Sequence, residues 1–214
     1  MISDWPWYEV VAGEALDQGD IVPACPVFNE IEVADDTKLV KARMTPVPAI
    51  VLTQTCDLVQ NKTDSVIVCE MWSVGKVVLQ DPTLRAKAEE TCRKERLTLP
   101  ASDSKTLERD IGAIIDKNGP LRSHFNAIIK GERPAYAMLE EHPQSGSPRW
   151  VVSFRDVYKM PKGLVSKAAL DAGKRLRLRS PYREHVSASF GRFFTRIGLP
   201  IDLVQYKSST SIPG

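Results

Sequence analysis

The chain has 214 residues, of which 43% are hydrophobic and 26% charged, and this balance is typical of a globular protein with a sizeable core. No apolar run approaches the roughly 18–20 residues that cross a bilayer, and residues 1–11 carry neither the basic nor the apolar region of a secretory signal. A cytoplasmic location without a membrane partner is therefore expected.

The net charge of +2 is divided unequally along the chain. Residues 159–214 contain eleven Lys or Arg against three Asp or Glu, a charge of +8, while residues 1–158 carry −6. A basic C-terminal third beside an acidic body favours RNA, another polyanion or an acidic protein as the partner. The alternative is that the two parts neutralise each other within one fold.

The first third of the chain predicts a meander of about five strands. Pro23 and Pro26 restrict the second strand to an edge or a bulged position, because proline cannot donate to a strand ladder. Two alternating segments around residues 34–37 predict a hairpin. The expected strands cover residues 5–11, 21–28, 29–33 with 39–44, 47–53 and 65–72.

Residues 81–132 change to helical patterns. Asp81 and Pro82 suit the N-cap and the first position of a helix. Two further helices each carry an i, i+4, i+7, i+8 apolar stripe, which predicts an αα-hairpin packed on itself and on the sheet. The two stripes are Leu107, Ile111, Ile114, Ile115 and Leu121, Phe125, Ile128, Ile129.

Strands resume after the helices, at residues 135–139 and 150–154, with a strand tail at 157–160 and a helical turn at 164–172. The alternating run at residues 175–179 predicts a half-buried strand with its basic side chains on one face. A last amphipathic helix is expected after the N-cap Ser180 and Pro181, ending at Gly198.

This order predicts one α+β domain. A strongly curved sheet or β-barrel, formed by residues 1–80 and 133–180, is interrupted by a helical insertion at 81–132 and followed by a packing helix at 181–198. About 50 residues would make a thin core on their own, so the insertion is not expected to be a separate domain.

Three short motifs in the first third resemble one known family. The motifs are Gly19-Asp20-Ile21-Val22, Pro48-Ala49-Ile50-Val51-Leu52-Thr53 and Val66-Ile67-Val68-Cys69. They are similar to the PemK/MazF-like group, whose SH3-like barrel opens with a GDI(V) strand and continues with an RPA-(V/I)-V-L-S strand. The resemblance implies a small SH3-like curved β-barrel and a bacterial endoribonuclease of a toxin–antitoxin system. Val47 stands where that family has its arginine, and Arg43 is the nearest candidate.

The polar cluster after the strand at 47–53 is the expected catalytic site. Cleavage of RNA through its 2′-hydroxyl needs a base, an acid and a cation beside the phosphate. Asp57 is the candidate base, Thr53 or Thr55 orients the phosphate, and Arg43 stabilises it. No cofactor is expected.

Cys56 allows two other interpretations of this polar cluster. It is a candidate nucleophile with a histidine supplied by the fold, from His124, His142 or His185. Together with Cys25 and a histidine it is also a candidate metal site. The remaining alternative is an ordinary strand end, with the thiol packed inward and Asp57 capping the next turn.

A basic C-terminal surface is the expected nucleic-acid contact. It consists of Arg175, Arg177, Arg179, Arg183, Arg192 and Arg196. Such a cluster would contact phosphates without reading sequence. The leading hypothesis is an RNA-binding protein that also cleaves RNA. The alternative is a non-catalytic interaction protein, such as an accessory subunit of a larger bacterial system.

Overall fold

The computed structural model describes residues 7–33, 40–142 and 146–195, with the backbone alone at residues 29–33 and 40–42. The strands are β1 Tyr8–Ala12, β2 Ile21–Val33, β3 Val40–Val51, β4 Ser65–Ser73, β5 Tyr136–Leu139, β6 Trp150–Pro161 and β7 Lys174–Leu178. The helices are α1 Thr55–Val59, α2 Val74–Gln80, α3 Pro82–Glu95, α4 Leu107–Lys117, α5 Gly119–Ile129, α6 Lys162–Asp171 and α7 Tyr182–Thr195. The α+β class is confirmed.

The main sheet is antiparallel and has the strand order β2-β3-β4-β6-β5, while β1 and β7 form a separate pair. The pair meets the main sheet at the start of β2, where Asp20 bridges to Arg177 and the amide of Leu178 donates to the carbonyl of Gly19 at 3.0 Å. Among the described strands, β2 and β5 remain the edges of the main sheet. The described strands therefore form an open sheet with a two-stranded extension and do not close into a barrel.

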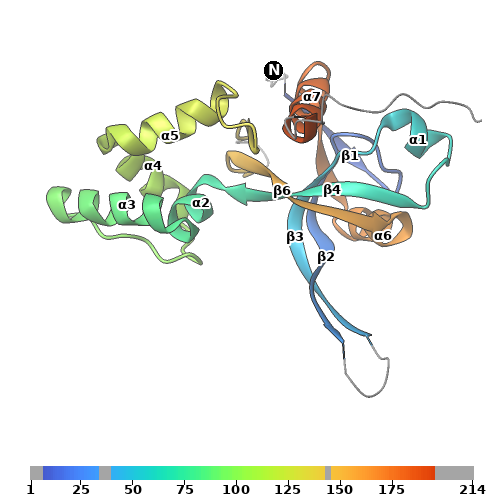
Figure 1. The fold of residues 1–214 in the computed structure, drawn as a ribbon, viewed down its shortest axis with the longest axis horizontal. Coiled ribbons are helices and arrows are strands. Elements are labelled where there is room, and N and C mark those ends of the chain that lie inside the picture. The colour runs from blue at the N-terminus through green and yellow to red at the C-terminus, as the bar shows by residue number, and fades with distance from the viewer. Residues whose placement is uncertain (1–6, 34–39, 143–145, 196–214) are drawn as a thin grey trace, which may run out of the picture.

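The predicted edge position of β2 is confirmed. Its register against β3 shifts between Val22 and Cys25, so that Pro23 falls in a bulge. The predicted hairpin is also confirmed, because Val33 pairs with Val40. Figure 1 shows this hairpin projecting away from the other strands.

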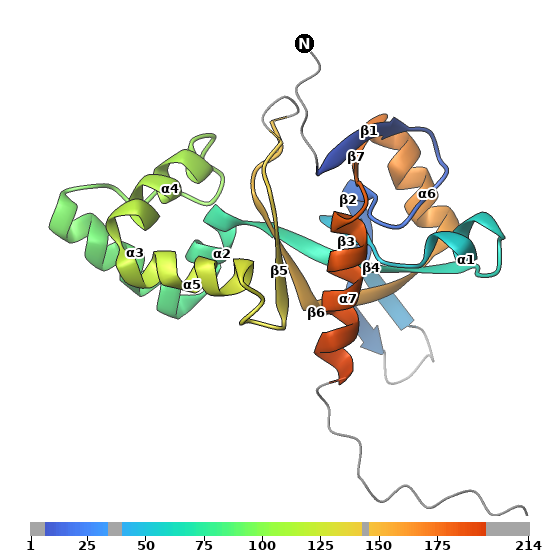
Figure 2. The same ribbon diagram turned by 90° about the horizontal axis from the view of Figure 1, so that it is seen from above.

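Three hydrophobic clusters hold the elements together. Figure 2 shows the helical unit α2–α5 at one side of the sheet, and α6 and α7 away from that unit. The first cluster lies between the main sheet, the β1–β7 pair and α7, around Phe154 and Leu178. The second covers the opposite sheet face under α6, around Cys25 and Val165. The third joins α2–α5 to β6 through Val151.

The helical insertion forms largely as predicted. The carboxylate of Asp81 caps α3 by accepting from the amides of Thr83 and Leu84 at 2.8 and 3.0 Å. The second and third stripes become α4 and α5, with Asn118 as the cap between them. The insertion starts earlier than predicted, since α2 follows β4 directly and Ser73 caps it.

The C-terminal helix starts at Tyr182, one residue after the predicted first position. Val186 is buried, and Phe190 and Phe193 pack against the first cluster. Phe194 keeps 45% of its surface exposed. The predicted helix end at Gly198 lies outside the described residues.

Gly75 allows α2 to pack closely against α4. Its amide donates to both carboxylate oxygens of Glu108, at 3.2 and 3.1 Å. A Cβ at this position would lie 2.6 Å from Glu108 Oε1 and 2.6 Å from Leu107 Cγ. Glycine is therefore required here by space rather than by backbone conformation.

Substitution Gly75→Ala is expected to destabilise the protein by about 1–3 kcal/mol, because α2 and α4 must move apart. The matched control is Gly112→Ala in α4, where a new Cβ meets nothing within 4 Å. That control is expected to stabilise the helix by about 0.5–1 kcal/mol. Urea denaturation of both variants measures the difference, and equal effects would contradict the packing argument.

Candidate functional site

The four predicted catalytic residues are not brought together. Thr53, Cys56 and Asp57 lie at the end of β3 and the start of α1. Arg43 lies in the projecting hairpin, where its backbone is opposite that of Glu30 in the strand register. Arg43 lies eight positions before the end of β3, which is about 26 Å along an extended strand. The hydroxyl of Thr53 accepts from the amide of Ile67 at 2.7 Å and so joins β3 to β4. Arg43 is therefore too distant to stabilise a phosphate beside Asp57.

Cys56 is exposed, so the predicted inward packing of its thiol is wrong. Its sulfur faces Gln54 Oε1 at 3.6 Å and Asp57 Oδ1 at 3.7 Å. The three histidines have other positions: His124 lies in α5, His142 stands edge-on to Tyr8, and His185 lies in α7. A cysteine–histidine pair is not assembled at this point of the described chain.

Cys25 is a core residue. It is fully buried in the second cluster, and this burial raises the pKa of its thiol to about 12. A thiol that resists ionisation is a poor metal ligand at neutral pH. The described residues contain no group of three His, Cys, Asp or Glu side chains placed to hold a metal ion. The predicted site between Cys25 and Cys56 is therefore not formed.

Arg175 and Arg177 share one face of β7 as predicted, but Asp20 neutralises that face, so it is not a basic surface. The Arg175 side chain has no exposed surface and donates to Asp20 Oδ2 from Nε at 3.2 Å and from Nη2 at 2.9 Å. Its other donors bond the carbonyls of Gly13 and Ala15 at 2.6 and 2.5 Å. Arg177 donates from Nε to Asp20 Oδ1 at 2.5 Å. Both guanidinium groups therefore stabilise the fold through these contacts.

The same network continues through the preceding turn to α1 and α7. Asp17 accepts from the hydroxyl of Thr55 in α1 and lies 3.6 Å from Arg177. The side-chain Nε2 of Gln18 donates to the carbonyl of Leu52 at 3.2 Å and to the hydroxyl of Ser187 in α7 at 2.8 Å. Thr55, which was considered as a phosphate-orienting residue, is thus engaged in holding this turn.

The other predicted arginines divide into two groups. Arg183 pairs with Glu184 at 2.8 Å and approaches Asp17 at 3.9 Å, so its charge is also balanced. Arg179 and Arg192 are exposed. Arg196 lies outside the described residues. The six arginines therefore do not form one surface.

Substitution Asp20→Asn is expected to destabilise the protein by about 3 kcal/mol or more, because it leaves the buried Arg175 without a counter-charge. The control is Asp171→Asn, which breaks the exposed pair with Lys167 and is expected to cost less than about 1 kcal/mol. Chemical denaturation at neutral pH compares the two variants. A loss at Asp20 no larger than at Asp171 would show that the buried network is dispensable.

A bulge in β6 creates a different site. Residues 150–152 of β6 pair with β4 residues 71–73, and residues 157–161 pair with β4 residues 65–69. Glu70 alone therefore faces residues 153–156. Bulges of this kind redirect side chains and are frequent beside active sites. Here the bulge carries Arg155 and Asp156 out of the regular alternation.

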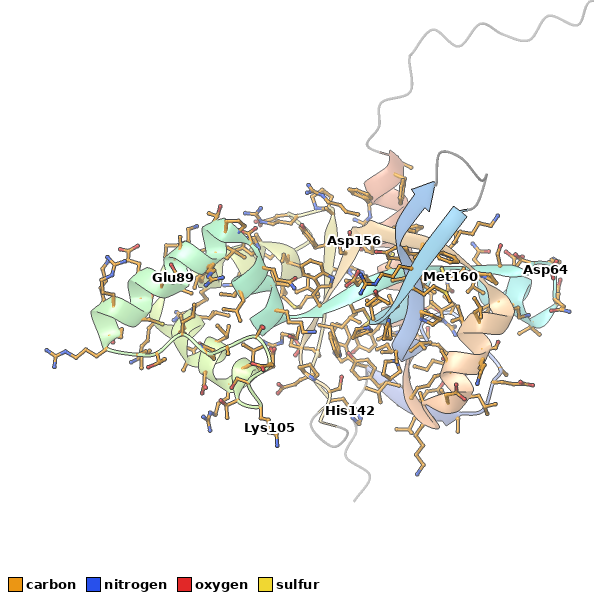
Figure 3. All side chains as sticks on the ribbon, turned by 90° about the horizontal axis from the view of Figure 1, so that it is seen from below. Asp64, Glu89, Lys105, His142, Asp156 and Met160 are labelled. Atoms are coloured by element: carbon orange, nitrogen blue, oxygen red, sulfur yellow. The ribbon has the colours of Figure 1, made fainter. Side chains whose placement is uncertain are left out.

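The redirected side chains line a cleft of about 380 Å³ between the sheet and the helical unit. Figure 3 shows Asp156 between the helices α2–α5 and the β2–β3 hairpin. The sheet supplies one wall of the cleft, while the end of α5 and the α2–α3 junction supply the other. The lining residues are Trp72, Val77, Gln80, Asp81, His124, Ile128, Arg133, Tyr136, Val151, Ser153, Arg155 and Asp156.

The cleft has two cations that make no direct ion pair among the described residues, although Asp81 and Asp156 also line it. Arg133 and Arg155 are exposed, and neither forms an ion pair with a carboxylate in the described part of the chain. The guanidinium of Arg155 lies 5.9 Å from the ring centre of Tyr136, within the range of a cation–π contact. The carboxylate of Asp81 is occupied as the cap of α3.

His124, which lines the cleft, and Glu70, which lies beside it opposite the bulge, both have shifted pKa values. Burial lowers the pKa of His124 below its ordinary 6.5, and the positive charge of Arg133 adds to the shift. Burial raises the pKa of Glu70 above its ordinary 4.5, and the carboxylate of Asp156 adds to the shift, against the hydrogen bond that the hydroxyl of Tyr158 donates at 3.4 Å. His124 is thus a neutral base at pH 7, and Glu70 retains its proton more readily than a free carboxyl group.

Together these groups can bind an anion and move protons. Arg133 and Arg155 attract phosphate, while the rings of Trp72 and Tyr136 offer faces for a nucleobase. A base and an acid whose pKa values are shifted toward each other form a usual acid–base catalytic pair.

The sequence predicts His124 only as a candidate partner of Cys56 and does not predict the other lining residues as a site. One signal was present, because Arg155-Asp156 interrupts an otherwise apolar strand.

No family model, curated protein or solved structure matches the chain. Among the described residues, no helix combines the length and apolar character needed to cross a membrane.

Proposed function

We propose that this protein binds RNA in the cleft at the β6 bulge and cleaves it by acid–base catalysis. The observation that carries the proposal is the cleft itself, where two arginines without carboxylate partners flank a neutral histidine and two aromatic rings. Phosphate contacts would provide most of the affinity, and stacking on an aromatic ring would hold the base. Work on RNA is consistent with the cytoplasmic location expected from the sequence.

The proposed reaction uses the ribose hydroxyl of the substrate as the nucleophile. The neutral imidazole of His124 takes the proton of the 2′-hydroxyl, and the 2′-oxygen forms a bond to phosphorus. The bond from phosphorus to the 5′-oxygen breaks, and the carboxyl group of Glu70 donates its proton to that oxygen. Arg133 and Arg155 stabilise the charge that develops on the phosphoryl oxygens. The products are a 2′,3′-cyclic phosphate and a 5′-hydroxyl.

The proposed activity is the one that the PemK/MazF-like resemblance implies, but the proposed site is the cleft at the β6 bulge and not the polar cluster after β3. An SH3-like barrel remains part of the proposal for the strands. The bridge between Asp20 and Arg177 supports that comparison, because it brings the β1–β7 pair against the edge of β2. In this proposal the barrel-like part is a scaffold, and the helical insertion supplies half of the cleft.

A non-catalytic interaction protein is the second candidate, favoured by the projecting hairpin (Figure 1). Phe28 and Met44 are direct cross-strand neighbours there, with 36% and 48% of their surfaces exposed. An apolar pair on a projecting arm suits docking to another subunit. Loss of partner capture with Phe28→Ser, while cleavage of RNA is unaffected, would separate this role from the enzymatic one.

Substitutions Arg133→Gln and Arg155→Gln are each expected to weaken RNA binding about tenfold, since each removes one charge-assisted phosphate contact. Each should also reduce the slope of log affinity against log salt by about 0.7, the value for one contact on a single strand. Fluorescence anisotropy with a labelled oligoribonucleotide measures both quantities.

The control for charge is Arg109→Gln, because Arg109 is exposed on α4 and lies outside the cleft. Its affinity and salt slope should match those of the wild type. Substitution His124→Asn should reduce cleavage by about 100-fold or more with binding retained. RNA binding that is insensitive to salt, or cleavage unchanged by His124→Asn, would refute the proposal.

The pH profile of kcat/KM should have its maximum between pH 4.5 and 6.5, the ordinary pKa values of Glu70 and His124. The rate rises as His124 loses its proton, at a pKa below 6.5, and falls as Glu70 loses its proton, at a pKa above 4.5. Substitution Glu70→Gln should remove the falling limb. A profile with its maximum above neutral pH would exclude these two roles.

A further inference from the structure

A second hollow lies beside the cleft and shares one wall with it. It has a volume of about 150 Å³ and is formed by the end of α5, the turn that follows, and one face of α7. Its lining residues are Ile129, Lys130, Gly131, Pro134, Tyr136, His185, Ser189 and Arg192. Tyr136 lines both hollows, so the two are contiguous across its ring.

The second hollow is positively charged and has free donors. Lys130 and Arg192 are both exposed, and neither forms an ion pair with a carboxylate in the regions that the structure describes. Arg192 makes one long contact, from Nε to the carbonyl of Ala188 at 3.5 Å. The hydroxyl of Ser189 donates within α7 to the carbonyl of His185. None of the described residues that line this hollow is acidic.

This charge contrasts with that of Arg183 in α7 and Arg177 in β7. Arg183 is balanced by Glu184 and Asp17, and Arg177 is balanced by Asp20. Lys130 and Arg192 reach one place from segments about sixty positions apart, on α5 and α7. Two cations held beside each other without a counter-ion repel, and an anion between them relieves the repulsion.

We infer that the second hollow is a phosphate subsite for the nucleotide next to the one in the cleft. Lys130 and Arg192 hold that phosphate, and Tyr136 separates the two nucleotides. The substrate is then a single RNA strand that runs from the helical insertion across β5 to α7. It is single-stranded because a base reaches the face of Tyr136 only when it is unstacked from its neighbours. The inference rests on the proposed RNA function of the cleft and adds the direction in which the strand continues.

The test compares ligands of one and three nucleotides on the full chain. The probes are uridine 3′-monophosphate and a 2′-O-methyl oligouridylate of three nucleotides, in which the blocked 2′-oxygen prevents cleavage. Wild-type protein should bind the longer probe about tenfold more tightly, since a further charge-assisted contact forms. The double variant Lys130→Gln/Arg192→Gln should lose this gain and bind the mononucleotide within about twofold of wild type.

The matched control is Arg109→Gln/Lys167→Gln, which removes two exposed cations that lie outside both hollows. It should keep the full gain with length. A longer 2′-O-methyl strand should bind less tightly once it is annealed to its complement. Circular dichroism confirms that each variant is folded.

The outcomes separate the two proposals. If the mononucleotide binds and the length gain is absent, or survives in the Lys130→Gln/Arg192→Gln variant, the second subsite is refuted and the cleft stands. Equal affinity for the single strand and the duplex also refutes it. If neither probe binds, the RNA function of the cleft fails, and the subsite fails with it.

Discussion

The fold depends on the buried carboxylate of Asp20. It stands at the junction of the two sheets and accepts hydrogen bonds from two arginines of β7. An unpaired charge in this position would be strongly destabilising, so the carboxylate and the two guanidinium groups must be kept together. Through Gln18 and Ser187 the same turn also fixes α7 against the end of β3. One ion cluster thus aligns the β1–β7 pair, the main sheet and the last helix.

That cluster also decides where positive charge remains available. The most basic segment of the sequence, Lys174–Leu178, has its arginines in internal ion pairs. The cations that line the two hollows come from elsewhere, on the α5–β5 turn, the β6 bulge and α7. The most basic segment of the sequence therefore belongs to the scaffold. A surface that attracts phosphate can be found only by asking which cations lack an ion pair in the folded chain.

The sequence allowed the local elements to be predicted far better than the site. Capping at Asp81, the proline-restricted edge strand β2 and the stripes of α4 and α5 are set by neighbouring residues, and periodicity reveals them. Strand alternation correctly places Arg175 and Arg177 on one face, but it does not show that Asp20 lies opposite, 155 positions before Arg175. The β6 bulge is hidden for the same reason, because it exists only in the register against β4.

The helical insertion explains why a site forms at this bulge and not elsewhere on the sheet. The cleft exists because α2–α5 stand opposite the part of the sheet that carries the bulge. Burial is the largest cause of the shift at Glu70, and it is also the largest cause of the shift at His124, which the insertion itself carries. At His124 this burial arises where α5 forms the wall of the cleft opposite the sheet. The insertion thereby provides the low-dielectric environment in which His124 becomes suited to act as a base.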